Sequence, residues 1–196
     1  TFNVQKYSAL WLTQGLLHPG FLDLAEQFIG PDIVLQRTSL YEKRRSKAIG
    51  PFRMHQDWIY GPMQRDTMVA GMIHVAKTTA AMGALRIYPG THKTRMEDCR
   101  ASDDAFAERF PLIEATVIEA EAGDVLFFSY LTIHGSGLNE SAEARTTLLV
   151  QMRDPEDLPI VETHLSRGQG AMLRGVDPLA NHGPGVDSSK LLEVAP

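Results

Sequence analysis

FRMHQDWIY, residues 52–60, is the stretch that decides the fold of this chain. It alternates and is rich in aromatic and large side chains, a composition typical of a β-strand. Successive side chains of a strand point to opposite faces, so His55 and Asp57 are expected to share one face. An imidazole and a carboxylate aimed at one point are two of the ligands that a transition metal can use. The stretch therefore predicts a strand that carries a large part of a metal site.

A third candidate ligand, His134, ends the apolar run DVLFFSYLTIH at residues 124–134 and precedes the turn residues GSGLN. Two histidines and one carboxylate form the facial set that holds non-haem Fe(II) and leaves three coordination positions open. A His-x-Asp triplet alone is a weak signal, because short motifs recur by chance. The second strand before His134 strengthens it, as does Arg145, which opens a further strand. His55, Asp57 and His134 are therefore the candidate metal ligands and catalytic residues.

Composition is typical of a single globular domain. The 196 residues amount to one domain, and a hydrophobic content of 43% is enough for a single core. The net charge is −5, and basic residues are scattered apart from one short run. That run consists of Lys43, Arg44, Arg45 and Lys47. We interpret it as a solvated loop, and we expect no nucleic-acid partner.

The apolar stretches and the cysteine content indicate where such a protein works. The longest apolar stretches are about ten residues, half of a membrane span, which predicts a soluble protein with no membrane partner. Cys99 is the only cysteine, which excludes an internal disulfide and a Cys-based zinc cluster. A reducing compartment fits this content, and we expect a cytoplasmic location. The chain begins at Thr1 without a signal-like segment, so expectations about targeting concern only the residues present.

Turn residues divide the chain into short predicted elements. Residues 6–29 have helix-like apolar spacing, interrupted at His18-Pro19-Gly20. Strands are predicted at residues 33–42, 52–60, 68–76, 84–89 and 144–154, two more within 116–130, and a loop with a helical turn at 97–110. Many short strands without strand-helix alternation indicate an all-β sandwich or barrel with helices on the N-terminal side.

Nothing in the sequence divides the chain into two domains. We find no internal repeat and no linker, which predicts a single domain over residues 1–175. Residues 176–196 are rich in Gly, Pro and Ser and are predicted to be a C-terminal tail.

Four segments resemble the phytanoyl-CoA dioxygenase family of Fe(II)- and 2-oxoglutarate-dependent oxygenases. They are HQDWIY (55–60), GALRIYPGTHK (83–93), AGDVLFF (122–128) and HGSGLNESAEAR (134–145). They follow the order and spacing of the family and span roughly residues 34–153. The resemblance implies a double-stranded β-helix, a cupin-like jelly roll, with the metal at its open mouth and supporting N-terminal helices. Family members usually have a longer N-terminal part, which this chain lacks or does not show.

The resemblance also implies roles for single residues. His55, Asp57 and His134 would bind Fe(II), and Arg145 would pair with the distal carboxylate of 2-oxoglutarate. A separate physical argument supports Arg145, since a buried dianion needs the bidentate partner that a guanidinium provides. Ser136 could add a hydroxyl donor to the same carboxylate.

Further residues are candidates for the walls of the site. Gln56 matches a family position that contacts the cosubstrate or its surroundings, although a strand residue between two inward ligands points the other way. Met72 stands where many members have Trp, so the cosubstrate pocket is expected to differ there. His74 shares the strand face of Met72 and is a candidate substrate contact, as are Tyr60 and Trp58. Aromatic residues on strands are also common in ordinary packing.

The implied reaction is hydroxylation of an unactivated C–H bond in a small-molecule metabolite, with O2 consumed and succinate and CO2 released from 2-oxoglutarate. Related halogenases carry a small residue at the position of Asp57, so the carboxylate favours hydroxylation. Desaturation, cyclisation or epimerisation by the same oxidant stays open. A cupin-like metalloenzyme without 2-oxoglutarate and a non-catalytic binding module are the rival classes. Arg145 and Ser136 argue against the first, and the intact triad argues against the second.

Overall fold

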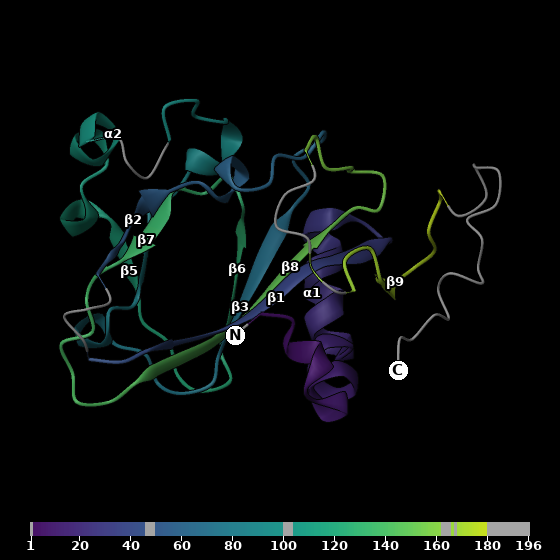
Figure 1. The fold of residues 1–196 in the computed structure, drawn as a ribbon, viewed down its shortest axis with the longest axis horizontal. Helices are drawn as coiled ribbons and strands as arrows, with labels where there is room; N and C mark the ends of the chain where they lie inside the picture. The colour runs from purple at the N-terminus through teal and green to yellow at the C-terminus, as the bar shows by residue number, and fades with distance from the viewer. Residues whose placement is uncertain (1, 46–49, 100–103, 162–165, 167, 180–196) are drawn as a thin grey trace.

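Two antiparallel sheets build the fold in the computed structural model, which describes residues 2–45, 50–99, 104–161, 166 and 168–179. The larger sheet has the strand order β6 (Val125–Ser129), β3 (Val69–His74), β8 (Arg145–Arg153), β1 (Ile33–Lys43) and β9 (Met172–Arg174). The smaller sheet has the order β2 (Phe52–His55), β7 (His134–Ser136), β4 (Leu85–Ile87) and β5 (Thr116–Ile118). The two sheets face each other across the molecule (Figure 1). The predicted double-stranded β-helix, a jelly roll, is confirmed.

Helices cover the outer faces of the sheets. α1 (Pro19–Ile29) begins with a proline at a position where the missing N–H costs nothing, and it follows a π-helical segment, η2 (Trp11–Leu16). α2 (Asp104–Arg109) lies against β2. Single 3-10 turns complete the helical content: η1 (Val4–Lys6), η3 (Asp57–Ile59), η4 (Ala80–Met82), η5 (Thr91–Lys93) and η6 (Leu112–Glu114). The predicted helical spacing with a break before Pro19 is confirmed.

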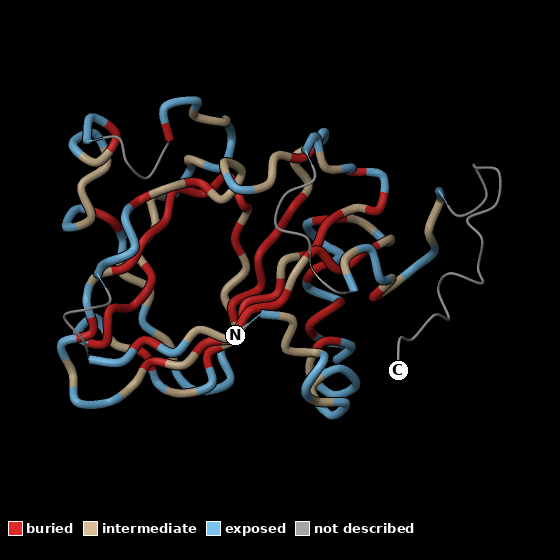
Figure 2. Tube along the Cα trace, viewed as in Figure 1, coloured by how far each residue is buried: buried red, intermediate tan, exposed pale blue. Residues whose placement is uncertain are grey.

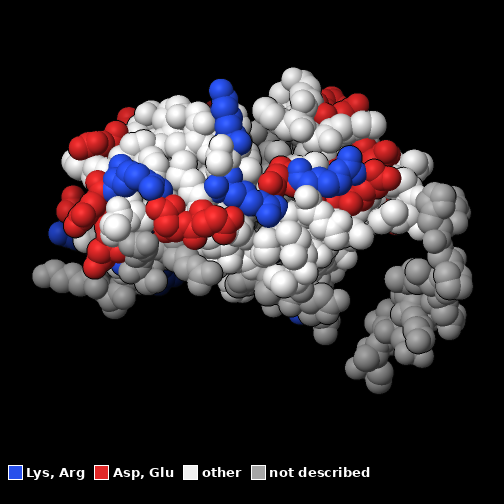
Figure 3. Space-filling view, turned by 90° about the horizontal axis from the view of Figure 1, so that it is seen from above, with Lys and Arg blue, Asp and Glu red and all other residues white. Residues whose placement is uncertain are grey.

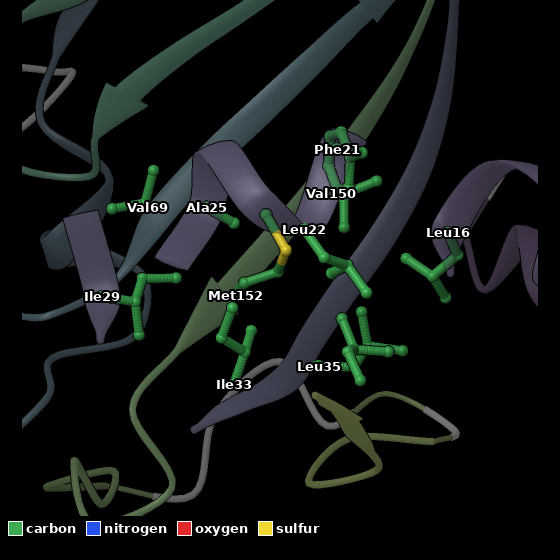
Figure 4. Close-up of a cluster of buried hydrophobic side chains, with 11 residues drawn as sticks. Leu16, Phe21, Leu22, Ala25, Ile29, Ile33, Leu35, Val69, Val150 and Met152 are labelled. Atoms are coloured by element: carbon green, nitrogen blue, oxygen red, sulfur yellow. The ribbon is translucent and has the colours of Figure 1, made fainter. Parts of the chain in front are cut away.

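The apolar side of α1 packs on the outer face of the larger sheet (Figure 4). Phe21 and Leu22 are buried there against Met152 of β8. At Gly71 in β3 the helix approaches so closely that a Cβ would lie 2.8 Å from the Phe21 ring. The three central strands of this sheet, β3, β8 and β1, are buried along most of their length (Figure 2). The helix therefore closes one face of the sheet and leaves the other face to line the interior.

Alternation along β8 assigns each side chain to one of two layers. Arg145, Thr147 and Leu149 face the space between the sheets. Val150 and Met152 belong to the cluster under α1. Because the period of a strand is two, the polar residues Arg145, Thr147 and Gln151 of β8 all reach the interior cavity.

Most of the predicted elements are confirmed. The strands predicted at 33–42, 68–76, 84–89 and 144–154, the two within 116–130 and the helical turn within 97–110 all have counterparts. The prediction for 52–60 is partly wrong, because β2 ends at His55. Gln56 is still extended, with φ −105° and ψ 140°, and η3 begins at Asp57. β7 and β9, each of three residues, were not predicted.

Charged side chains of both signs are mixed at the surface. On the face shown in Figure 3, basic and acidic groups lie close together, so this face has no broad basic area among the described residues. Ion pairs such as Arg65–Glu156 at 2.6 Å and Arg109–Asp98 at 2.9 Å join opposite charges. No helix in the described part of the chain is long and apolar enough to span a bilayer. Of the predicted tail, residues 180–196 lie outside the described residues.

Candidate active site

The three candidate ligands meet where the smaller sheet opens into the interior. β2 and β7 pair His55 directly with His134, and their ring centroids lie 4.4 Å apart. Asp57 Oδ1 lies 3.4 Å from His55 Nε2 and 3.7 Å from His134 Nε2. One ligand atom from each residue lies within 4.8 Å of the other two. All three side chains line one cavity, so the face opposite the ligands is open.

Backbone carbonyls orient both imidazoles. His55 Nδ1 lies 2.7 Å from the carbonyl oxygen of Arg53, and His134 Nδ1 lies 2.9 Å from that of Thr132. A carbonyl only accepts, so each Nδ1 carries the proton and donates it. Each Nε2 therefore presents its lone pair to the same point as Asp57, which is the arrangement seen for metal-bound histidines.

Electrostatics favours an ionised carboxylate beside a neutral imidazole. Burial opposes ionisation of Asp57, but His134 and His55 outweigh it and hold the pKa of Asp57 below its ordinary value. Burial lowers the pKa of His134, whereas at His55 the effect of burial is outweighed by the hydrogen bond and charge of Asp57, which raise its pKa. Two ligand atoms about 2.1 Å from one ion and at right angles lie about 3 Å apart. The observed separations are slightly wider, so the residues fit a metal ion after a small inward shift.

Gln151 of β8 holds Asp57 from the opposite sheet. Its Nε2 donates to Asp57 Oδ2 at 3.0 Å, which leaves Oδ1 toward the histidines. Groups that orient a ligand in this way affect metal affinity by about 10- to 100-fold. Gln151→Leu should therefore weaken Fe(II) binding by that factor, measured by anaerobic Fe(II) titration.

The matched control for this prediction is Gln64→Leu, at an exposed glutamine outside the cavity. It should bind Fe(II) as the wild type does. Equal Fe(II) affinity in Gln151→Leu and the wild type would show that Gln151 does not position Asp57. Urea midpoints of both variants separate a change in stability from a change in the metal site.

A pair of buried cations lies at another part of the interior. Lys43 and Arg145 occupy directly paired positions on β1 and β8, and they are 3% and 4% exposed. Lys43 Nζ donates to Ser136 Oγ at 2.8 Å and to the carbonyl of Gly137. Arg145 Nη1 donates to the carbonyl of Gly83 at 2.7 Å, while its Nε has no partner in the structure. Among the described residues, no carboxylate forms an ion pair with either cation.

Burial makes both charges costly. It lowers the pKa of Arg145 to about 10. Burial and then the charge of Arg145 lower the pKa of Lys43 to about 8. Thr147 Oγ1 and His74 Nε2 are also buried polar atoms without a partner. Uncompensated buried charges and unpaired polar atoms are rare in folded proteins. Their convergence here indicates a binding site for an anion.

The cavity between the sheets joins the metal ligands to this cationic end. Its volume is about 300 Å³, and Met72, Ser136 and Arg145 line it together with the triad. Ser136 follows His134 by two residues on β7, a distance of about 7 Å along a strand. A five-carbon dicarboxylate is of comparable length. Such a molecule could reach the metal with one end and the two cations with the other.

The structure places Gln56 elsewhere and corrects its predicted role. The side chain is completely buried on the far side of the strand and does not line the cavity. Its Nε2 donates to the carbonyls of Leu131 at 2.5 Å and Thr94 at 2.9 Å. Its Oε1 accepts from Trp58 Nε1 and from the backbone N–H of Met96. The extended backbone at Gln56 turns the side chain away from its two neighbours, so it braces the loops behind the ligands.

Of the three predicted substrate contacts, one lines the cavity and two do not. Tyr60 lines the cavity, and its ring meets His55 edge-on with centroids 5.6 Å apart. Trp58 packs against a buried cluster that includes Met63 and does not line the cavity, because the η3 turn carries it outward. His74 also does not line the cavity and is 1% exposed. The structure thus corrects the roles predicted for Trp58 and His74.

Sequence reasoning missed Lys43 and interpreted it as part of a solvated loop. Arg44 and Arg45 are exposed as predicted, and Lys47 lies outside the described residues. Lys43 differs because it is the last residue of β1, on the face shared by Arg37 and Tyr41. The strand period could have revealed this, since residues 37, 41 and 43 have the same parity.

Comparison with known proteins assigns the family. A family model described as phytanoyl-CoA dioxygenase (PhyH) matches residues 8–147. The chain belongs to the phytanoyl-CoA dioxygenase family. This PhyH chain is 29% identical over 150 residues to a probable alpha-ketoglutarate-dependent hypophosphite dioxygenase of Stutzerimonas stutzeri, covering 71% of the chain and 52% of that protein. It is 30% identical over 145 residues to the human peroxisomal phytanoyl-CoA dioxygenase, covering 66% of the chain and 42% of that enzyme. The chain thus spans about half the length of these curated relatives.

Solved structures show the same fold. The apo form of the non-heme monooxygenase ThoJ has a TM-score of 0.70 at 20% identity, covering 90% of the PhyH chain and 66% of that protein. EctD from S. alaskensis, solved with 2-oxoglutarate and 5-hydroxyectoine, also has a TM-score of 0.70 at 20% identity, covering 80% of the PhyH chain and 56% of EctD. These likenesses support the jelly-roll architecture described above.

Proposed function

We propose that this PhyH-family chain carries the catalytic centre of an Fe(II)- and 2-oxoglutarate-dependent oxygenase that hydroxylates an unactivated C–H bond of a small-molecule metabolite. One observation carries the proposal: a His-Asp-His set and the buried cation Arg145 line one cavity, and Lys43 lies beside them, paired with Arg145 and bonded to Ser136. The pair fits a dianion, and the His-Asp-His set fits Fe(II). The relatives described above include a probable alpha-ketoglutarate-dependent hypophosphite dioxygenase and a phytanoyl-CoA dioxygenase, which supports the same chemistry.

Each residue has a defined task in this function. His55, Asp57 and His134 would hold Fe(II) and leave three positions open toward the cavity. Arg145 and Lys43 would bind the distal carboxylate of 2-oxoglutarate, with Ser136 as a hydroxyl partner between them. Bound Fe(II) would supply the site at which 2-oxoglutarate and O2 react, with succinate and CO2 as products. The walls of the cavity would exclude bulk water from that reaction.

The direct test is anaerobic titration of the Fe(II)-loaded protein with 2-oxoglutarate. We expect a visible metal-to-ligand charge-transfer band, which forms when the keto acid chelates the metal. Glutarate is the matched control, because it has both carboxylates and lacks the keto oxygen, and it should give no band. Folded protein that binds Fe(II) and gives no band with 2-oxoglutarate would refute the cosubstrate.

The same oxidant could instead drive desaturation, cyclisation or epimerisation. Asp57 would supply a carboxylate ligand where related halogenases carry a small residue, but it does not separate these other outcomes. Turnover under 18O2 separates them, because hydroxylation places one labelled oxygen in the product. We expect that label, and an unlabelled product with labelled succinate would favour one of the alternatives. A cupin-like enzyme without 2-oxoglutarate is disfavoured by the Lys43–Arg145 pair.

The lowered pKa of Lys43 predicts how pH affects cosubstrate binding. A group with a pKa of about 8 in the empty site is charged below pH 8 and loses its proton above it. A bound carboxylate favours the charged form of Lys43. Above pH 8, the binding of 2-oxoglutarate must therefore be accompanied by uptake of a proton at Lys43. The Kd for 2-oxoglutarate should therefore rise by up to about tenfold per pH unit above pH 8 and stay flat below it. Arg145 is the charged neighbour that acts on Lys43, and it remains protonated across this range.

The measurement is band titration with 2-oxoglutarate between pH 6.5 and 9. Lys43→Met should bind 2-oxoglutarate more weakly and lose the rise above pH 8. Lys77→Met is the control, because Lys77 is exposed and pairs with Glu121 at 2.7 Å, so it should reproduce the wild-type profile. A pH profile that Lys43→Met leaves unchanged would contradict the assignment.

A further inference from the structure

Arg37 reaches the cavity because β1 contains a bulge. Leu35 pairs with Met152 and Arg37 with Gln151, so Gln36 is an extra residue without a place in the ladder. A bulge of this kind changes the direction of side chains, and both Gln36 and Arg37 line the cavity. Regular alternation would bring only one of the two side chains, Gln36 or Arg37, to the cavity. The bulge brings both, and it thus places the guanidinium of Arg37 on the cavity wall.

The position of Arg37 brings it near the metal ligands. Its strand partner Gln151 donates to Asp57, and the charge of Arg37 is among the influences that lower the pKa of Asp57. Along β1, Arg37 and Lys43 are six residues apart, about 20 Å at the rise of a strand. A cosubstrate held by Lys43 and Arg145 cannot also occupy Arg37. The cavity therefore has two separate cationic regions.

The guanidinium of Arg37 is held by packing and has no polar partner. It stacks on the Phe2 ring at 4.3 Å, which leaves the N–H edge of the group free. Within the residues described, no hydrogen bond or ion pair engages the side chain of Arg37. The neighbouring Gln36 is already engaged, because it accepts a hydrogen bond from Arg153 of β8 at 3.0 Å. Asp57 is the only carboxylate among the described residues that line the cavity, and it belongs to the metal ligands. The wall itself therefore offers no anion to Arg37.

We propose that Arg37 binds an anionic group of the substrate, a carboxylate or a phosphorus oxyanion, and so selects small anionic metabolites. This rests on the proposed function, because the substrate must lie beside the metal that the triad holds. A planar guanidinium matches both kinds of oxyanion through two parallel hydrogen bonds. Tyr60 and Met68, which line the same cavity, can contact the apolar part of such a molecule.

The test uses protein loaded with Ni(II) and 2-oxoglutarate, which cannot turn over. Benzoate, hexanoate and phenylphosphonate are the probes, with benzamide and hexanamide as their neutral counterparts, and calorimetry measures each Kd. We expect the acids to bind more tightly than the amides. Arg37→Gln should weaken acid binding by about tenfold or more and leave the amides unchanged. Comparison of the carboxylates with the phosphonate shows which oxyanion the site prefers.

Two further variants keep the result interpretable. Arg44→Gln, at an exposed arginine just beyond β1, should bind every probe as the wild type does. Arg37→Lys keeps the charge but lacks the fork, so it should recover part of the acid preference. In Arg37→Gln the 2-oxoglutarate charge-transfer band should keep its wild-type intensity and Kd, which also shows a folded site.

Three results would overturn the assignment: no acid binds the wild type, acids and amides bind alike, or Arg37→Gln binds the acids unchanged. Loss of 2-oxoglutarate binding in Arg37→Gln alone would move Arg37 to the cosubstrate site and also overturn it. Absence of the band in the wild type is a different failure, because it refutes the proposed function. The two proposals can therefore fail separately.

Discussion

Asp57→Ala should abolish Fe(II) binding and succinate release. Asp57 is the only anionic ligand of the triad, and its Oδ1 lies within 3.7 Å of both histidine Nε2 atoms. Loss of a group that merely orients a ligand costs about 10- to 100-fold in metal affinity, so loss of the ligand itself should exceed about 100-fold. Fe(II) titration and 2-oxoglutarate-dependent succinate release are the two measurements.

Asp104→Ala is the matched control for this substitution. Asp104 is an exposed carboxylate on α2 that pairs with Arg53 at 2.6 Å and does not line the cavity. The control should bind Fe(II) and release succinate as the wild type does. Succinate release by Asp57→Ala at the wild-type rate would disprove the triad. A wild-type urea midpoint in Asp57→Ala would show that the loss belongs to the site and not to the fold.

The long strands could be predicted from sequence, and the shortest could not. β1 and β8 have eleven and nine residues, enough for alternation to be visible. β7 and β9 have three residues each, which is less than two full periods of a strand. β7 forms because its neighbours β2 and β4 supply backbone partners on both sides. Its place depends on tertiary pairing that a local pattern does not contain.

The candidate metal ligands were predictable because histidine and aspartate are residue types that bind metals. His55 and Asp57 kept a shared face although the strand ends between them, since the backbone at Gln56 remains extended. The turn that follows was not visible in the sequence, and it carries Trp58 out of the cavity. Spacing therefore predicted the direction of the ligands better than the length of the strand.

Arg145 was predicted from the family resemblance, and strand parity points to Lys43, but the pairing of the supporting residues could not be predicted because strand register brings them together. Lys43 and Arg145 are 102 positions apart in the chain (145 − 43), and they are directly paired across β1 and β8. Arg37 and Gln151 meet in the same way beside a bulge. In sequence Lys43, Arg37 and Gln151 are ordinary polar residues in or after a strand. Only the register brings them together, with a cation pair at the proposed cosubstrate end and a second cation near the candidate metal ligands.

Arg145→Gln should weaken 2-oxoglutarate binding by about 100-fold or more. Removing one partner of a buried charge pair costs about 3–5 kcal/mol, which corresponds to about 100- to 5000-fold in Kd. Lys43 would remain as the only cation at that end of the cavity. Titration of the charge-transfer band measures the Kd, and succinate release at saturating 2-oxoglutarate shows whether turnover can be rescued.

The expected effect of Arg145→Gln on stability has the opposite direction. In the empty site Arg145 is a buried cation without a carboxylate partner among the described residues, so its removal should not lower the free energy of unfolding. A glutamine amide can still donate to the carbonyl of Gly83. Arg153→Gln, at another buried arginine of β8, is the control and should keep the wild-type Kd for 2-oxoglutarate. Weak binding together with undiminished stability assigns Arg145 to the cosubstrate, whereas a large loss of stability with an unchanged Kd would make Arg145 a structural residue.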